Sequence, residues 1–344
     1  MTNEQWNNLI DIINGNVPAT PPVGFIIDSP WLPNWADISI MDYFTDGRLW
    51  FMANLKAVEQ FRDIMFMPGF WPEFGMCTEP SAFGCKCIFP ENKFPTPAKL
   101  ITDVSRFDSI KKPNPRTDGF CPFVIKRLKQ FQGQIEAKGH AIKFAVSRGP
   151  LNLASFLIGT TEFLTACKTE THKAHKLLNT ITDFIVDWIQ TQAEAFSSID
   201  GIFILDDIVG FLGEEDFKEF AMGYLKRIFD AADVTVKFFH NDAEGLVCTP
   251  FLPQIGVNLF NFSFKHSISE LKKLSGNKVT LMGNIPPRDV LANGTVDDVR
   301  KSVTDVIDSL EDKSKILFSC GGGMPPGVPT ENIEAFYSAV KGKV

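Results

Sequence analysis

The sequence predicts a (β/α)8 TIM-type barrel, an α/β fold in which eight parallel strands alternate with helices. The chain has 344 residues, of which 44% are hydrophobic, and this is enough for one large core. From residue 141 onward, apolar runs of strand length alternate with amphipathic helical segments, which is typical of a parallel sheet covered by helices. Six such strands follow residue 140, "GFIID" (24–28) is a seventh, and an eighth is expected near 62–66 or 85–89. A doubly wound open sheet is the alternative, but the Gly-rich first turn of that fold is absent here.

The N-terminal third begins with regular elements and then changes character. Residues 3–14 read as a short helix, 21–28 as a buried strand, and 46–64 as a helix with apolar residues at helical spacing. Residues 66–122 contain nine prolines, many Phe and four of the seven Cys, and are predicted to be an irregular insertion near the barrel mouth. A helix over about 122–138 follows.

The strands and helices after residue 140 are predicted from the alternation of apolar runs with amphipathic segments and from residues typical of helix starts. Acidic residues begin the helix expected at 214–232, where the helix dipole favours them, and Pro329 precedes the last helix. The other predicted strands are 141–148, 201–207, 235–242, 257–263, 278–285 and 315–321; the other predicted helices are two short ones up to 168, then 171–196, 267–274, 295–310 and 329–342. We therefore expect residues 1–344 to form a single barrel domain.

Charge and cysteine content narrow the classes of function. The net charge of −7, without a basic stripe, argues against a nucleic-acid partner. The start has neither a basic segment nor a long apolar run, and no 18-residue apolar run occurs, so we expect no signal peptide and no membrane span. An odd number of Cys in such a chain favours reduced thiols, and a cytoplasmic location is predicted.

Polar and ligand-type side chains collect where the predicted strands end, while the strand interiors are Val, Ile, Leu and Phe. In barrels of this kind the active site is built at those carboxyl ends. The strand-end residues are Asp28, Arg148, Asp206, Asp207, His240, Asn241, Asp242, Asn261, Asn284 and Cys320. Together, His-x-Asp on one strand end and Cys on another supply nitrogen, oxygen and sulfur ligands that zinc accepts.

Each of these residues also has a structural explanation. His240 alone fits a hydrogen-bonded core histidine, and Cys320 alone fits a small buried apolar residue. Asp206 and Asp207 fit caps of a following turn, and Asn284 in "GNIPP" fits a turn residue that also faces the pocket. Glu79 fits an ordinary loop carboxylate. The metal hypothesis therefore depends on the fold bringing the strand ends together.

The tail "LMGNIPPRDVLANGTVDDVRKSVTDVIDSL…ILFSCGGGMPPGVPTENIEAFYSAVK" resembles the uroporphyrinogen decarboxylase superfamily. The middle segments "GPLNLASFLIGTTEFL", "DGIFILDD" and "EEDFKEFAMGYLKRIF" are similar as well, so the resemblance covers roughly 140–342 well and the first third loosely. The decarboxylases of this superfamily hold a substrate with many carboxylates through arginines near the N-terminus. This chain has "FIIDSPWLPNW" at that place and no Arg among its first 47 residues, so binding many carboxylates there is physically implausible.

The other branch of the superfamily contains corrinoid-dependent methyltransferases, which bind zinc through His-x-Cys on one strand end and a Cys in the tail. Carried over, the resemblance implies His240 and Cys320 as zinc ligands. Asp242 stands at the middle position, where the thiol-activating members have Cys, and a carboxylate there makes the metal more Lewis acidic. Asp242 or Glu79 would complete the protein ligands.

The resulting hypothesis is a zinc-dependent methyltransferase that moves a methyl group from a small methylated donor, for example a methoxylated aromatic compound, to the corrinoid of a partner protein. The chain has no Asp-x-His-x-x-Gly corrinoid motif, so any cobalamin must arrive on that partner. Asp206, Asp207 and Asn284 are the expected catalytic residues. The expected substrate-binding residues are Asp28, Trp31, Trp35, Phe70, Trp71, Arg148 and Asn261, although the aromatic ones also fit core and loop packing. The alternatives are a cofactor-free decarboxylase and a non-catalytic binding barrel.

Overall fold

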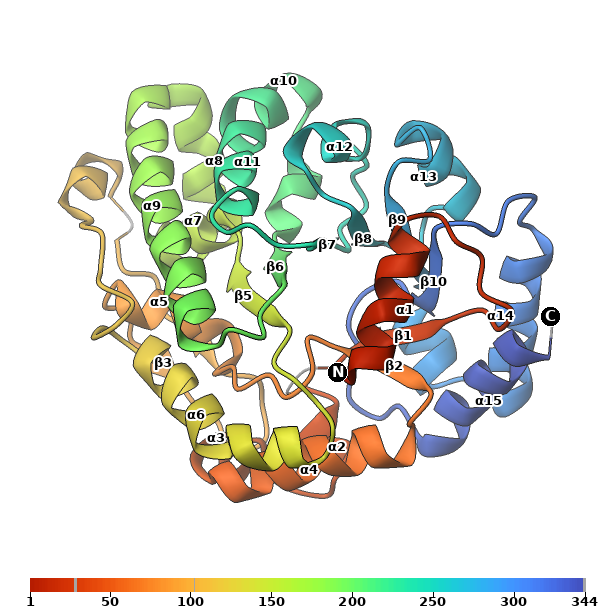
Figure 1. Cartoon of the computed structure of the whole chain (residues 1–344). Helices are drawn as coiled ribbons and strands as arrows, with labels where there is room; N and C mark the ends of the chain where they lie inside the picture. Colours follow the sequence, from red (N-terminus) through yellow and green to blue (C-terminus); the bar gives the residue numbers. More distant parts are fainter. Residues whose placement is uncertain (28–29, 102, 343–344) are drawn as a thin grey trace.

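The computed structural model describes residues 1–27, 30–101 and 103–342, and in it eight parallel strands form one curled sheet (Figure 1). The order around the sheet is β2-β1-β10-β9-β8-β7-β6-β5, so the chain passes from strand to strand without the reversal that defines a doubly wound sheet. The predicted barrel class is confirmed. The strands are β1 (Val23–Ile26), β2 (Ile64–Met67), β5 (Phe144–Arg148), β6 (Gly201–Leu205), β7 (Val236–Asn241), β8 (Leu259–Phe262), β9 (Thr280–Ile285) and β10 (Ile316–Cys320).

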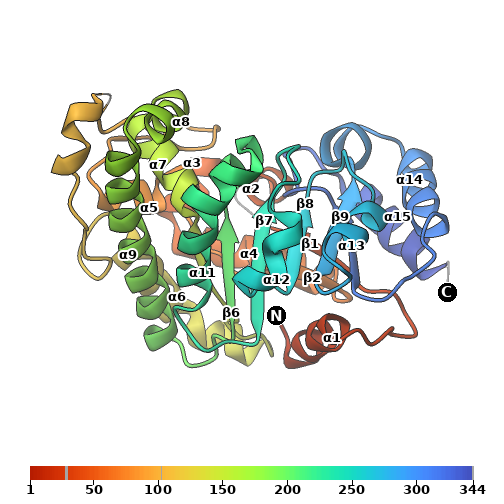
Figure 2. The ribbon, with the colours of Figure 1, turned by 90° about the horizontal axis from the view of Figure 1, so that it is seen from above.

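Helices surround the outer face of this sheet (Figures 1 and 2). Those of the regular part are α6 (Cys121–Ala137), α7 (Pro150–Ile158), α8 (Thr160–Thr169), α9 (Thr171–Ala195), α10 (Glu214–Phe217), α11 (Gly223–Phe229), α12 (Leu252–Ile255), α13 (Ile268–Leu274), α14 (Val296–Asp308) and α15 (Thr330–Lys341). A π-helical turn, η4 (Lys218–Met222), divides the single helix expected at 214–232. Shorter turns are η3 (Asp207–Phe211), η5 (Thr249–Phe251) and η6 (Pro287–Ala292). Across the described residues, none of the helices combines the length and the apolar character that crossing a membrane requires.

The N-terminal segment closes one end of the barrel. Helix α1 (Asn3–Ile13) contributes Trp6, Leu9 and Ile12 to the cluster that fills the barrel interior. Trp6 packs edge-on against Phe144 at the start of β5, with 5.2 Å between ring centroids. The helix therefore fills the barrel interior at the end where the strands begin, and the interior is open to a site from the end where the strands finish.

The ring of backbone hydrogen bonds is interrupted between β2 and β5, which are the two end strands of the sheet. The prediction of a fully closed sheet was therefore wrong at this one seam. Side chains satisfy the free edge of β5 instead. The Gln192 amide donates to the Val146 carbonyl and accepts from the Val146 N–H, both at 3.0 Å, and Glu79 accepts from the Arg148 N–H at 3.1 Å. Buried backbone groups need such partners when no strand is present.

Residues 66–122 are irregular, as predicted, and their first part packs into the seam. This segment contains η1 (Gly75–Cys77), α5 (Thr78–Ala82), the two-stranded hairpin β3 (Cys87–Ile88) and β4 (Thr96–Pro97), and η2 (Val104–Ser109). The eighth barrel strand is β2, so the expectation near 62–66 holds and the one near 85–89 corresponds to the small hairpin. Sequence periodicity did not predict the short helices before β2, namely α2 (Leu32–Trp35) and α3 (Ile40–Thr45), whereas α4 (Gly47–Gln60) was expected.

Candidate metal centre

Three side chains with metal-ligating atoms meet at the carboxyl end of the barrel. His240 lies near the end of β7, Asp242 follows that strand, and Asp207 is the second residue after the neighbouring strand β6. One ligating atom from each lies within 4.8 Å of the others. The His240 Nε2 atom is 3.5 Å from Asp207 Oδ1 and 3.9 Å from Asp242 Oδ2. Because active sites of barrels are built at this end, the three residues define the candidate centre.

The alternation of side chains along β7 carries the His240 ring into this position. Val236 and Phe238 belong to the interior cluster, and His240 is the next residue of that inward-facing series. His240 is buried, whereas the side chains of Asp207 and Asp242 are 37% and 43% exposed. A buried nitrogen and two more accessible carboxylates therefore share one site that is open toward the barrel mouth.

Asn261, on the adjacent strand β8, fixes the protonation pattern of the imidazole. Its Nδ2 donates to the carbonyl oxygens of Met282 at 2.8 Å and Cys320 at 3.2 Å, so its Oδ1 must be the acceptor facing His240. The His240 Nδ1 atom lies 2.8 Å from that oxygen and therefore carries the proton. In the neutral ring the Nε2 lone pair then points toward the two carboxylates. This is the arrangement in which an outer hydrogen bond prepares a histidine for a metal.

The two carboxylates are held close to each other. The Asp242 N–H donates to Asp207 Oδ1 at 3.2 Å. The pKa of Asp242 is raised, first by burial of its carboxyl group and then by the charge of Asp207 and the hydrogen bond between the two carboxyls, while His240 acts in the opposite direction. Two negative charges this close repel each other, and a bound proton or cation relieves that repulsion.

Gly322, in the loop after β10, makes room for this arrangement. Its φ is +125°, a conformation that favours glycine, and a Cβ at this position would lie 2.6 Å from Asp242 Oδ2. The tail glycines therefore have a steric role beside the site, and residue types other than Gly would displace the carboxylate.

The three donors fit a divalent metal ion. Zinc accepts imidazole nitrogen and carboxylate oxygen, and catalytic zinc sites commonly use three protein ligands and one open position. Here one nitrogen lone pair and two carboxylates converge, and their exposed side leaves space for a further ligand. Among the residues that the structure describes, no other group of three or more His, Cys, Asp or Glu side chains brings its ligating atoms this close together.

Cys320 and Glu79 are not brought into this grouping, although both were expected as ligands. The Cys320 side chain belongs to the outer core cluster together with Phe318, and its Sγ lies 3.3 Å from the Gly322 carbonyl oxygen. The expectation assumed that a residue at a strand end faces inward, whereas the alternation along β10 turns this one outward. Cys320 contributes to the site through its backbone carbonyl, which accepts from Asn261. Glu79 lies at the seam beside β5.

Asp206 also faces outward, one position out of phase with Asp207. Its two carboxylate oxygens accept from the N–H groups of Leu151 and Asn152, at 2.8 and 3.0 Å, at the beginning of α7. It is completely buried, and burial raises its pKa despite these hydrogen bonds. Its carboxylate therefore caps the N-terminus of α7, a helix that precedes it in the chain, whereas the sequence suggested a cap of the following turn.

Asn284 and the aromatic residues are placed away from the centre as well. The Asn284 amide donates to the His266 carbonyl and lines a separate cavity of about 300 Å³ next to α14. Trp31 is fully buried and donates to the Val328 carbonyl at 3.1 Å. Trp35 stacks on Trp31 at 5.2 Å, and Phe70 is a core residue. Asp28 lies outside the described residues.

Two of the expected substrate-binding residues do meet at the seam, together with an acidic partner. The Arg148 guanidinium forms a buried ion pair with Glu73 at 3.0 Å and lies over the ring of Trp71, 5.5 Å from its centroid. Trp71 in turn packs against Phe203 of the barrel interior, with 6.1 Å between ring centroids. Glu79 completes this cluster, and burial raises its pKa. Glu73 and Gln192 were not singled out from sequence, because neither lies at a strand end.

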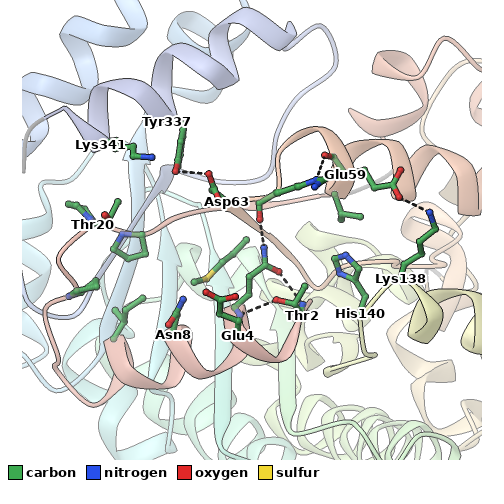
Figure 3. A pocket seen from close by; sticks show the side chains of 18 residues that line it. Thr2, Glu4, Asn8, Thr20, Glu59, Asp63, Lys138, His140, Tyr337 and Lys341 are labelled. Carbon is green, nitrogen blue, oxygen red and sulfur yellow. Dashed lines mark hydrogen bonds and ion pairs between the residues drawn. The ribbon is translucent and has the colours of Figure 1, made fainter.

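A cavity of about 830 Å³ lies at the opposite end of the barrel (Figure 3). It is lined by α1, by residues before β5 and by α15, and several of its charged groups are already paired. Lys138 contacts Glu59 at 2.8 Å, and the Tyr337 hydroxyl donates to Asp63 at 3.0 Å. The ligating side chains, rather than the cavity volume, therefore identify the candidate centre.

Comparisons with known proteins agree with this fold. Residues 7–342 match the family model described as uroporphyrinogen decarboxylase (URO-D). The uroporphyrinogen decarboxylase of Pseudoalteromonas translucida is 25% identical over 281 residues, covering 76% of this chain and 75% of that protein. The enzyme of the same name from Hordeum vulgare is 25% identical over 234 residues, covering 65% and 68%.

Two solved structures are similar in fold. A methyltransferase from Methanosarcina mazei superposes with a TM-score of 0.81 at 19% identity, covering 97% of both chains. A B12-independent methionine synthase from Shewanella sp. W3-18-1 gives a TM-score of 0.55 at 12% identity, covering 94% of this chain and 96% of that one. At these identities the two structures establish the shared fold and nothing finer.

Proposed function

Because the chain belongs to the uroporphyrinogen decarboxylase family, we propose that it is a zinc-dependent methyltransferase of that family, with Asp207, His240 and Asp242 as the zinc ligands. The proposed reaction moves a methyl group from a small methylated donor to the corrinoid of a partner protein. The observation that carries the proposal is the His240 imidazole, whose Nε2 lone pair is directed at two carboxylates by the hydrogen bond to Asn261.

Some residues of the site would hold the ion, and others orient its ligands. A bound zinc ion would act as a Lewis acid on the donor atom that carries the methyl group. Asp207 and Asp242 supply negative charge and keep the open position on the solvent side. Asn261 holds the imidazole in the ligating tautomer, and Gly322 leaves space for the Asp242 carboxylate. A carboxylate in place of a thiolate favours polarising an oxygen or nitrogen atom over activating a thiol.

The class of donor is inferred from the surface that faces the interior. Of the aromatic residues expected to bind substrate, Trp71 is the one that faces the barrel interior. It packs there against Phe203. A methoxylated aromatic compound combines an ether oxygen for the metal to polarise with a ring that can pack on an aromatic side chain such as Trp71. The acceptor is assigned to a separate corrinoid protein, since the sequence has no corrinoid motif.

Decarboxylation without a cofactor is the alternative, and the names of the curated relatives favour it. Two observations weigh against it. The first 47 residues contain no Arg to bind a polycarboxylate. Arg148, the arginine at the carboxyl end of β5, is already paired with Glu73 in a buried ion pair. A guanidinium that is neutralised in this way binds further carboxylates less well, because breaking a buried pair is costly.

Metal analysis tests the proposal directly. Purified protein is treated with a mild chelator, reloaded with zinc and analysed for elements, in parallel with His240→Ala, Asp242→Ala and Cys320→Ala. We expect stoichiometric zinc in the wild type and in Cys320→Ala, and strongly reduced zinc in the other two variants. Absence of zinc from the reloaded wild type would contradict the proposal and leave the decarboxylase or a non-catalytic barrel.

Activity assays then distinguish the methyltransferase, the decarboxylase and the non-catalytic barrel. Release of carbon dioxide from uroporphyrinogen by metal-free protein would identify a decarboxylase. Demethylation of methoxylated aromatic compounds with a reduced corrinoid protein would support the proposed function. If the protein is inactive in both assays but binds one of these ligands, a non-catalytic barrel is the remaining explanation.

A further inference from the structure

The metal centre leaves the cysteines of the 66–122 insertion unused, and we propose that Cys77 and Cys87 form a redox-sensitive dithiol that closes to a disulfide when a hydroperoxide oxidises Cys87. The inference is independent of the proposed function. It rests on the closeness of the Cys87 thiol to Cys77, on the different exposure of the two residues, and on the framework that carries them.

A network of backbone hydrogen bonds holds the two cysteines in place. Cys77 is the last residue of η1, immediately before α5, and Cys87 is the first residue of β3. The Cys85 N–H donates to the Pro80 carbonyl at 3.1 Å, so the chain after α5 folds back onto this helix. The Met76 N–H donates to the Pro95 carbonyl at 3.1 Å, so η1 is also joined to the end of the β3–β4 connection.

The Cys87 side chain lies against the backbone of Cys77 within this framework. The Cys87 Sγ atom lies 4.0 Å from the Cys77 carbonyl oxygen and 3.7 Å from the Cys85 carbonyl oxygen. Only ten positions separate Cys77 and Cys87 in the sequence, so their approach requires no movement of distant elements.

The two sulfur atoms differ in the way that a reactive and a resolving cysteine differ. Cys77 is fully buried, whereas Cys87 is partly exposed. The interaction between the two thiol groups lowers the pKa of Cys87 and raises that of Cys77. Cys85 is buried, and burial raises its pKa to about 12, so it stays protonated. Thiolate character and access therefore both select Cys87 for the first attack.

The chemistry balances with one hydroperoxide as the oxidant. The Cys87 thiolate attacks the O–O bond, a sulfur–oxygen bond forms, and the alkoxide or hydroxide leaves and takes up a proton, which gives a sulfenic acid. The Cys77 sulfur then attacks the Cys87 sulfur, its proton goes to the departing hydroxide as water, and the S–S bond forms. A dithiol reductant returns two electrons and two protons.

A structural metal ion is the competing explanation for several cysteines in one segment. Among the residues that the structure describes, however, no three Cys, His or acidic side chains of this segment have ligating atoms that converge as those of Asp207, His240 and Asp242 do. Two neighbouring cysteines are enough for a disulfide, whereas a structural zinc site requires four ligands.

Peptide mapping tests the proposal on the full chain. Reduced protein is treated with a few equivalents of hydrogen peroxide, the remaining thiols are alkylated, and tryptic peptides are analysed without reduction. Trypsin cleaves after Lys86, so residues 63–86, which contain Cys77 and Cys85, separate from residues 87–93, which contain Cys87. We expect these two peptides to be linked, with a mass two hydrogens below their sum, and to separate after dithiothreitol.

Variants identify the partner of Cys87. Cys85→Ser is expected to keep the link, Cys77→Ser to lose it and leave Cys87 over-oxidised, and Cys248→Ser, at a buried cysteine of another segment, to behave like the wild type. A link that disappears in Cys85→Ser would overturn the proposal. So would oxidation of Cys87 to sulfinic acid in the wild type without any link, or a stoichiometric metal that protects these cysteines. If a variant fails to fold, fragmentation of the linked wild-type peptides decides the matter, because it shows whether Cys77 or Cys85 carries the alkyl group.

Discussion

Replacing Asn261 with Leu should weaken metal binding although Asn261 is not a ligand. The substitution keeps a side chain of similar size at a fully buried position of β8. It removes the acceptor of the His240 Nδ1 proton and both amide donors to the Met282 and Cys320 carbonyl groups. The imidazole is then free to adopt the other tautomer or to rotate, so Nε2 is no longer held toward the two carboxylates.

The size of the effect follows from these contacts. Removing an outer hydrogen bond from a ligating histidine typically lowers metal affinity about 10- to 100-fold. Each of the three lost hydrogen bonds contributes about 1 kcal/mol to the free energy of unfolding, and the buried groups left without partners add to the loss. We therefore expect a loss of about 3–5 kcal/mol in metal-free stability together with the loss of affinity.

Asn332 offers a matched control. It is also buried, and its amide donates to two carbonyl groups, those of Leu291 and Gly294, both at 2.9 Å. Asn332→Leu should therefore lose comparable stability without any change at His240. Zinc affinity is measured by competition with a chromophoric chelator, and stability by urea unfolding of the metal-free proteins.

Two results would refute this reasoning. Zinc affinity of Asn261→Leu within threefold of the wild type would show that the hydrogen bond does not prepare His240. An equal loss of affinity in Asn332→Leu would show that affinity follows general stability. Measuring both quantities in both variants distinguishes these outcomes.

Three other substitutions have expected outcomes. Since the pKa of Asp242 is raised, its ionisation destabilises the metal-free protein as pH rises from the ordinary aspartate range through the raised value. Asp242→Asn should therefore raise the Tm of metal-free protein at pH 7 and leave it unchanged at pH 3; a lower Tm at pH 7 would contradict this. Gln192→Leu removes both hydrogen bonds to Val146 and should lower the free energy of unfolding by about 2–4 kcal/mol, against less than about 1 kcal/mol for the exposed Gln190→Leu, measured by urea unfolding. Gly322→Ala should reduce zinc content by displacing the Asp242 carboxylate and change the unfolding free energy less than the Gln192 variant does; full zinc content by elemental analysis would refute the steric role.

The fold was predictable because its signal is repeated many times along the chain. Most apolar runs of strand length were followed by an amphipathic segment, and the topology of parallel strands does not depend on any single residue. The seam between β2 and β5 was not predictable, since its closure depends on Gln192 in the last turn of α9 and on Glu79 in an irregular segment. Neither residue has a local pattern that marks it as a partner of a distant strand edge.

The candidate site was predictable by region but only in part by residue. The sequence located the strand ends correctly, but a strand end does not state which face a side chain occupies. A shift of one residue exchanges the two faces, which is why Asp207 enters the centre while Asp206 caps a helix. For the same reason His240 faces inward and Cys320 outward. The inward series Val236, Phe238, His240 could have revealed this phase from periodicity alone.

Helix α1 has a consequence for biosynthesis. Its apolar side chains are translated before the strands that they pack against, and the Thr280 hydroxyl that approaches the Ile12 carbonyl is 268 residues further along. An emerging chain therefore carries an unburied amphipathic helix until nearly the whole sheet has been synthesised. Contacts of such large sequence separation form late and slowly. We expect ribosome-bound chains that end before β9 to expose Trp6 and Leu9, and to be the species that chaperones bind.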